Sequence, residues 1–311
     1  MLRELERIST TTGVYAFVVL LGLLWGSFAN VCIYRWPPTD EFPKGRSVVR
    51  PGSHCFACKT PIRWYDNIPL LSWLWLRGRC RTCRAPFSPR YLIVEAVMGA
   101  LFGFAWWVSI EQGVWWGESF DLRLVRFAIQ AAFCFVMVVI AFIDLDHKLI
   151  LNKVTVPSII AFYLLGLLLP ERRWYDGLVG AVVGYGVPWA IGELYMLIRG
   201  REGLGLGDSD MLAAVGALLG WPGALVSLFG GAMFGAVIGV VALVIAQRRA
   251  RGQPAPEPAE NPAADGADEG EPDPPSLMRT ELPFGPFLAM GAVFYLFAEP
   301  WIQLKFVSPF G

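Results

Sequence analysis

The sequence has little charge for its length and lacks an excess of either sign. Its 311 residues include 26 Lys or Arg and 26 Asp or Glu, so the formal net charge is zero, while 55% of the residues are hydrophobic. This composition is too apolar for a soluble protein of this size. It excludes an ordinary soluble enzyme and predicts a polytopic membrane protein. The sequence also lacks an internal repeat at the period of a solenoid.

The first hydrophobic run lacks the features of a removable signal peptide. Residues 1–12 carry Arg3 and Arg7, which are balanced by Glu4 and Glu6, and no A-x-A cleavage site follows. A signal peptide begins with a net positive charge and ends at such a site. We therefore predict that the run at 13–32 is a retained transmembrane helix.

Hydrophobic runs of about 20 residues, the length that crosses a bilayer, recur along the chain. They cover residues 13–32, 92–110, 124–143, 154–170, 177–198, 223–246 and 283–302. A shorter run at 210–221 can cross only if it tilts or is shielded by protein. The sequence therefore predicts about eight transmembrane helices.

The segment 33–91 between the first two long runs is strongly basic. It contains eleven Lys or Arg residues and three acidic residues. The positive-inside tendency places this segment in the cytoplasm, and the alternation of crossings puts 144–153, 199–209 and 247–282 on the same side. A basic segment can also bind nucleic acid, but one tethered between helices is attracted to anionic lipid headgroups. We expect membrane lipid and no nucleic acid as a partner.

Four of the six cysteines form the pattern C-x2-C-x21-C-x2-C. They are Cys55, Cys58, Cys80 and Cys83. Each pair has the spacing of a metal-binding knuckle, and cytoplasmic thiols stay reduced, which disfavours two disulfides. A redox dithiol is the competing interpretation, but it needs only one pair. Because four cysteines complete a tetrahedral shell, we predict a structural zinc ion. Cys32 and Cys134 lie in hydrophobic runs and are interpreted as packing residues.

Two aspartates adjoin hydrophobic runs on the predicted cytoplasmic side. Asp144 stands near the start of IDLDHKLILN, directly after the run at 124–143, and Asp208 ends the segment GLGLGD. A charge at membrane depth costs a few kcal/mol, so such an acid is often functional. If the two carboxyl groups meet, one can stay protonated while the other is ionised, which suits acid–base hydrolysis of a peptide bond. Gly205 and Gly207 leave room there for a substrate backbone.

Simpler interpretations of these acids remain open. Asp208 can cap the helix that follows it, and Asp144 can be an ordinary polar residue after a helix. Asp146, His147 and Asp210 are weaker candidates nearby, since each can simply be solvated. The residue pattern alone does not decide between these alternatives.

Six motifs occur in a fixed order along the chain: GSFANVCIYRWP (26–37), DNIPLLSWLWLRGRCRTC (66–83), RYLIVE (90–95), IDLDHKLILN (143–152), GLGD (205–208) and LPFGPFLAMGA (282–292). Together they resemble the type IV prepilin peptidases, the bifunctional leader peptidase and N-methyltransferase enzymes of type IV pilus and type II secretion systems. The resemblance covers nearly the whole chain outside an acidic, proline-rich segment. Several ordered motifs are far more specific than any one of them.

The resemblance implies an aspartic membrane protease of the GxGD type, and it assigns the catalytic roles to Asp144 and Asp208. The implied reaction is cleavage of the leader from prepilins or pseudopilins at the cytoplasmic face of the bacterial inner membrane. N-methylation of the new N-terminal residue is also implied, with S-adenosyl-L-methionine as donor. No glycine-rich fingerprint of a soluble methyltransferase occurs, so the donor-binding residues are unknown and we expect them in the cysteine-bearing loop.

Three positions depart from the family pattern. Leu151 stands where proline is usual, Phe56 where proline is common in the first knuckle, and Asp210 where lysine is frequent. The acids and the thiols are intact. The negative charge of Asp210 lies close to Asp208 in sequence and can influence its protonation or its contact with substrate.

Two functions of other classes compete with the protease. A proton-coupled membrane transporter uses acids within the bilayer, but acids at one boundary fit this poorly. A zinc-stiffened membrane scaffold accounts for the cysteines but leaves GLGD without a use.

We expect the chain to have five parts: a first transmembrane helix at 1–32, a basic zinc domain with four cysteines at 33–91, a transmembrane peptidase core at 92–246, a disordered acidic linker at 247–282, and a last transmembrane helix with the C-terminus at 283–311.

Overall fold

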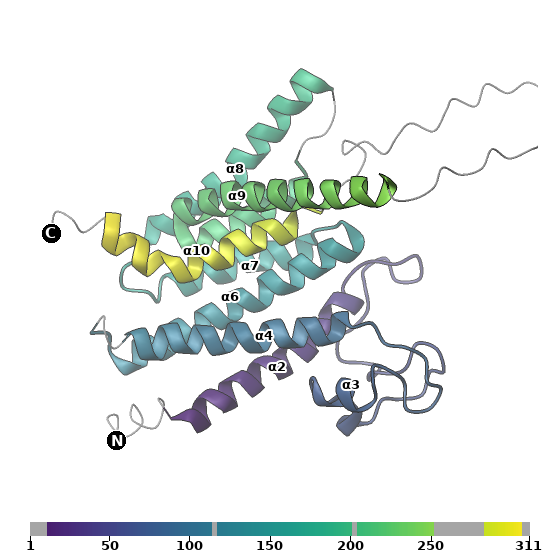
Figure 1. Ribbon diagram of the computed structural model, residues 1–311. Helices are drawn as coiled ribbons and strands as arrows, with labels where there is room; N and C mark the ends of the chain where they lie inside the picture. The colour runs from purple at the N-terminus through teal and green to yellow at the C-terminus, as the bar shows by residue number, and fades with distance from the viewer. Residues whose placement is uncertain (1–10, 114–116, 201–203, 252–282, 307–311) are drawn as a thin grey trace, which may run out of the picture.

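The fold is all helical over the residues that the computed structural model describes, 11–113, 117–200, 204–251 and 283–306, where it has isolated β-bridges but no strand. The helices are α2 (Thr12–Arg35), α3 (Leu71–Trp75), α4 (Arg90–Trp106), α6 (Phe120–His147), α7 (Asn152–Gly166), α8 (Trp174–Arg199), α9 (Leu206–Arg251) and α10 (Gly285–Phe306), with the short η1 (Trp64–Asn67) and η2 (Trp107–Gln112) (Figure 1). The predicted all-α membrane fold with a small cysteine-bearing loop domain is confirmed.

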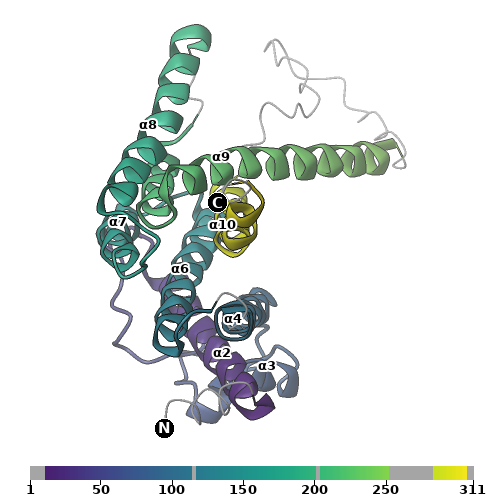
Figure 2. The ribbon, with the colours of Figure 1, turned by 90° about the vertical axis from the view of Figure 1, so that its left-hand side faces the viewer.

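Helix α6 lies in the middle of the arrangement. It packs against α2 and α4 on one side and against α10 on the other, and α10 in turn packs against α9 (Figure 1). Helix α9 also packs against α7 and α8, while its C-terminal part runs away from α8 (Figure 2). The molecule thus has an N-terminal group of helices that carries the cysteine loop and a C-terminal group built around α9, joined by α6.

Six helices are long and apolar enough to cross a membrane among the described residues. They are Thr12–Arg35, Arg90–Gln112, Phe120–His147, Trp174–Arg199, Leu206–Val241 and Gly285–Ile302. Each of the eight predicted runs is largely helical, but α7 has only 15 residues and ends at Gly166, and the runs at 210–221 and 223–246 are two parts of α9. Gly220, with φ 71° and ψ 179°, breaks the helix between these parts. Glycine takes a positive φ without steric strain, which permits the break.

Glycines bring the backbones of α8 and α9 into close contact. A Cβ added to Gly180 would lie 2.1 Å from the carbonyl oxygen of Gly216, and one added to Gly184 would lie 2.2 Å from that of Leu212. Between α9 and α10, a Cβ on Gly231 would lie 3.0 Å from the nitrogen of Leu288. Small residues permit such close packing of helices in a membrane. Gly186 differs, because a Cβ there would meet nothing within 4 Å.

We predict that Gly180→Ala destabilises the α8–α9 contact by about 1–3 kcal/mol, because the new methyl group forces the helices apart. Thermal unfolding of the purified protein in detergent measures the effect. Gly186→Ala, on the same helix, is the matched control and should unfold like the wild type. Equal unfolding temperatures for the two variants would contradict this close packing.

The loop between α2 and α4 is fixed to the helices by two cations. Arg35, which is buried, donates to the carbonyl oxygens of Ser47 and Gly52 at 2.9 and 3.3 Å. Lys153, on α7, donates to the carbonyl oxygens of Trp36 and Lys44. The loop is therefore held by both helical groups.

The boundary predicted at 247 lies inside a helix. Helix α9 continues to Arg251, so residues 247–251 are helical. The rest of the predicted linker lies outside the described residues.

Candidate functional site

Asp144 lies in the last turn of α6 and is buried, with 6% of its surface exposed. The helix ends at His147, and the next residue, Lys148, has a left-handed conformation (φ 50°) and donates its N–H to the carbonyl oxygen of Asp144 at 2.8 Å. The backbone N–H of Gly285, in the first turn of α10, donates to Oδ2 of Asp144 at 2.9 Å. The carboxyl group is thus oriented by a residue 141 positions away in the sequence. LPFGPFLAMGA contains this glycine, but nothing in the sequence assigned it a partner.

Asp208 lies in the first turn of α9 and is half-buried. Its backbone N–H donates to the carbonyl oxygen of Gly205 at 3.1 Å. Since α9 begins at Leu206, Asp208 lies inside the helix and is not its N-cap residue. The next glycine, Gly207, packs against Ile150, since a Cβ on it would lie 2.8 Å from Cβ of Ile150. The GLGD segment thus rests on the IDLDHKLILN segment.

This contact places the start of α9 beside the segment that follows Asp144. The charge of Asp144 acts on the carboxyl group of Asp208, although the two residues come from α6 and α9. A close carboxyl pair shares a proton more readily than it holds two negative charges. Such a pair can remove a proton from water and donate one to a substrate. The arrangement can therefore perform general acid–base chemistry.

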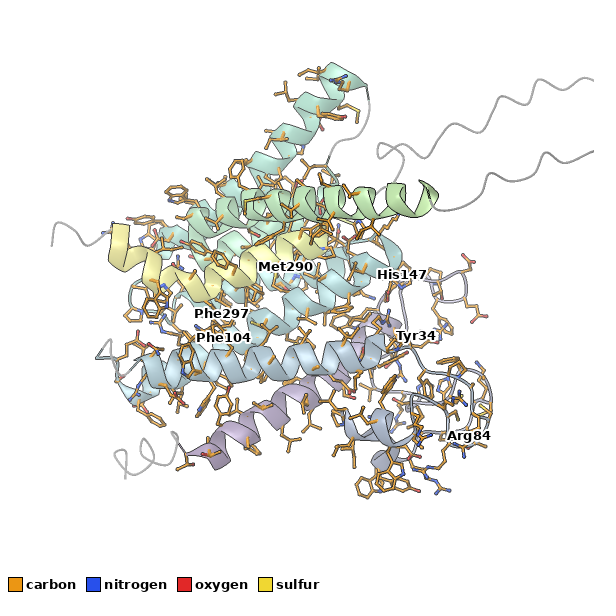
Figure 3. All side chains as sticks on the ribbon, viewed as in Figure 1. Tyr34, Arg84, Phe104, His147, Met290 and Phe297 are labelled. Carbon is orange, nitrogen blue, oxygen red and sulfur yellow. The ribbon has the colours of Figure 1, made fainter. Side chains whose placement is uncertain are left out.

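The weaker candidates nearby have other surroundings. Asp146 forms an ion pair with Arg90 at the start of α4, which ties the end of α6 to the N-terminal helices. His147 is exposed, and Asp210 is half-buried on α9. Figure 3 shows His147 at the same end of the molecule as Tyr34 and the cysteine loop with Arg84. The acid pair and the loop therefore occupy one end of the bundle.

The four cysteines converge as their spacing predicted. Their Sγ atoms all lie within 4.8 Å of one another, with Cys55 and Cys83 at 3.7 Å and Cys58 and Cys80 at 4.0 Å. Four sulfurs around a tetrahedral zinc ion lie about 3.8 Å apart, given a zinc–sulfur distance of about 2.3 Å. The geometry of this group, the four-cysteine cluster, fits a zinc ion.

The two halves of the four-cysteine cluster have the same backbone structure. The N–H of Cys55 bonds the carbonyl of Thr60 at 3.0 Å, and that of Cys80 bonds the carbonyl of Ala85 at 2.9 Å. Lys59 directly follows Cys58, and Arg84 directly follows Cys83. Both residues have a positive φ, of 57° and 60°. These turns direct both thiols of each pair to one point. The fold thus builds two equivalent knuckles from local sequence.

Hydrogen bonds make part of the four-cysteine cluster easier to ionise. Those with Thr60 lower the pKa of Cys58 to about 6. The backbone N–H groups of Cys83 and then Thr82 lower the pKa of Cys80. Since the thiolate is the form that binds a metal, these contacts favour metal binding.

Two protein-family models match this chain, one over the four-cysteine cluster and one over the two acids. The model of the bacterial peptidase A24 N-terminal domain matches residues 20–109, which include the four-cysteine cluster, and that of the type IV leader peptidase family matches residues 131–240, which include both acids.

Several relatives are named prepilin leader peptidase/N-methyltransferase. The one from Aeromonas hydrophila is 38% identical over 225 residues, covering 67% of this chain and 73% of the relative. The one from Klebsiella pneumoniae is 37% identical over 206 residues, covering 66% and 85%. The one from Neisseria gonorrhoeae is 34% identical over 237 residues, covering 70% and 78%. No solved structure matches the chain.

Proposed function

Since this chain belongs to the type IV leader peptidase family, as its motifs predicted, we propose that it cleaves the leader from type IV prepilins or pseudopilins and methylates the new N-terminus. The relatives' names support both activities. The observation that supports the peptidase half is the electrostatic effect of Asp144, in the last turn of α6, on Asp208, in the first turn of α9.

In the proposed hydrolysis, the ionised member of the acid pair takes a proton from water while the water oxygen attacks the carbonyl carbon of the scissile peptide bond. The protonated member donates its proton to the carbonyl oxygen, giving a tetrahedral intermediate. When the carbon–nitrogen bond breaks, the pair gives its proton to the leaving amine nitrogen and takes one from a hydroxyl of the tetrahedral intermediate, so it again holds one proton. The N–H of Gly285 keeps the carboxyl group of Asp144 in place for these transfers.

The site lies where a membrane-inserted substrate can reach it. Asp144 ends a transmembrane helix and Asp208 begins another, so both acids lie at a boundary of the apolar layer. A prepilin has a basic leader followed by a hydrophobic helix, and its scissile bond meets that boundary. We propose that this boundary is the cytoplasmic face of the bacterial inner membrane, because the basic loop lies at the same end (Figure 3).

The four-cysteine cluster is proposed to hold a structural zinc ion. Four thiolates leave no open position for water, so the ion shapes the loop and does not take part in hydrolysis. The proposed methyl transfer uses S-adenosyl-L-methionine, in keeping with the relatives' names.

A cleavage assay tests the peptidase proposal against its rivals. Purified protein in lipid nanodiscs is incubated with a peptide that has a basic, glycine-ending leader and a hydrophobic segment, and the products are identified by mass spectrometry. We expect cleavage after the glycine. A scaffold would leave the peptide intact, and a transporter would instead move protons across proteoliposomes without cleaving it.

We also predict that Gly285→Ala lowers the kcat of cleavage by about ten- to a hundredfold with little change in KM. The added Cβ would lie 2.7 Å from Oδ2 of Asp144 and displace it, and small displacements of catalytic groups have effects of this size. Gly291→Ala on the same helix is the matched control, since its Cβ would meet the carbonyl oxygen of Ser227 at 2.8 Å and not an acid. Equal kcat values for the two variants would show that Gly285 acts only in packing.

A further inference from the structure

The short helix α3 in the cysteine-bearing loop exposes an apolar face. Its Leu71, Leu74 and Trp75 are 65%, 58% and 83% exposed, and residues three and four positions apart lie on one side of a helix. The short helix η1 packs against α3 and adds Trp64, which is 80% exposed. We call these four residues the α3 patch. A group of large exposed apolar side chains marks a surface that binds a partner.

The opposite face of α3 is fixed to two membrane helices. Ser72 and Trp73 line a cavity that α2 and α4 also line. The N–H of Leu70, directly before α3, donates to Oε2 of Glu95 on α4 at 2.8 Å. Leu70 has a positive φ of 59°, so this hydrogen bond holds the chain in an unusual conformation where α3 begins. These contacts keep the α3 patch turned away from the helices.

Helix α3 lies at the level of the end turns of the membrane helices. Glu95 is five residues inside the span Arg90–Gln112, which is about 7.5 Å from its end at 1.5 Å per residue. Ser27 of α2, eight residues before the span ends at Arg35, lines the same cavity as α3. Figure 1 shows α3 beside these ends of α2 and α4. The headgroup region of a bilayer surrounds helices at this level.

Exposed cations flank the α3 patch. Arg63 directly precedes Trp64, and Arg77 follows the last turn of α3. Arg77 has a positive φ of 53°, which turns the chain as it leaves the helix. Helices that lie in a membrane interface place Trp and Leu at the boundary of the acyl chains, and their Lys and Arg attract anionic headgroups. The α3 patch and its two cations have this arrangement.

We propose that the α3 patch inserts into the bilayer interface at this end of the molecule, and that Arg63 and Arg77 bind anionic phospholipid headgroups. Helix α3 then anchors the cysteine-bearing loop to the leaflet beside it. The basic charge of the loop predicts attraction to headgroups, and the α3 patch adds the entry of apolar side chains below them. This anchor is independent of the proposed enzymatic activities.

Photolabelling of the full chain in nanodiscs tests the anchor. The discs contain phosphatidylcholine, phosphatidylglycerol and a trace of a phospholipid whose acyl chain carries a diazirine near its ester end. Mass spectrometry identifies the labelled residues. We expect label on the α3 patch as well as on the membrane-spanning helices. Label on the spanning helices but none on the α3 patch would overturn the proposal.

A charged substitution within the α3 patch provides the matched comparison. Leu74→Glu should lower labelling of the other three patch residues about fivefold, because a carboxylate resists entry into the acyl region and the burial of leucine is lost. Val49→Glu is the control, since Val49 is 77% exposed on the same loop but lies outside the α3 patch. Thermal unfolding of both variants shows that they are folded. Wild-type labelling of a folded Leu74→Glu variant would contradict insertion.

Discs of phosphatidylcholine alone test the part assigned to the cations. Arg77→Gln should lower labelling of the α3 patch about fivefold in the anionic discs and leave it unchanged in the neutral discs. Equal labelling of Arg77→Gln and the wild type in anionic discs would remove the role of Arg77. If a photoactivatable prepilin-like peptide labels the α3 patch and the lipid does not, the patch binds substrate and the lipid anchor is wrong.

Discussion

Replacing Asp144 or Asp208 with asparagine is expected to lower the rate of leader cleavage about a thousandfold or more. Asparagine keeps the size of the side chain but can neither take a proton from water nor donate one as an acid. Its amide oxygen can still accept the hydrogen bond that Gly285 donates to residue 144, so the fold should persist. Initial rates of cleavage of a prepilin-like peptide, followed by mass spectrometry, measure the effect.

Asp121→Asn is the matched control for this experiment, because Asp121 lies in the first turn of the same helix as Asp144, at its opposite end, and is exposed. It should cleave at the wild-type rate. Methyl transfer to pre-cleaved pilin provides a second readout, and both active-site variants should retain it if the donor binds elsewhere. Normal cleavage by either Asp144→Asn or Asp208→Asn would end the assignment of the acid pair.

The second large effect is expected at the four-cysteine cluster. Cys80→Ser should reduce the bound zinc from about one ion per chain to nearly none, because a structural zinc site contributes about 10–16 kcal/mol to the order of the peptide that surrounds it. Methyl transfer should fall with the metal, since the donor-binding residues are expected in the cysteine-bearing loop that the ion orders. Leader cleavage should fall far less, because the acid pair is held by α6, α9 and α10. Elemental mass spectrometry of the purified protein gives the zinc content.

Cys134→Ala is the matched control for Cys80→Ser. Cys134 is fully buried in α6, away from the four-cysteine cluster, so its replacement should leave zinc binding unchanged. Full zinc occupancy in Cys80→Ser would show that the four thiols do not form a metal site. Loss of zinc from both variants would point to general unfolding, which the cleavage rate detects independently.

Much of the arrangement could be read from the sequence because it depends on local spacing. The knuckles at Cys55 and Cys80 form from residues two to five positions apart, so the C-x2-C pattern nearly fixes their geometry. The membrane helices could be predicted because the length and the apolar composition of each run indicate that it can cross a bilayer. The position of Gly220 was harder, since only the backbone conformation shows that it divides α9.

The sequence by itself determined that the chain lies in a membrane, which thiols can share a metal and which acids stand at helix ends. Only the tertiary structure decided that the start of α9 lies against the segment after Asp144, and that Gly285 of α10 donates a hydrogen bond to Asp144. These residues come from α6, α9 and α10, and their placement depends on how these helices pack, for example where Gly231 of α9 lies against Leu288 of α10. Packing between distant segments, unlike the spacing within a knuckle, is set by side-chain and backbone contacts that no local pattern encodes.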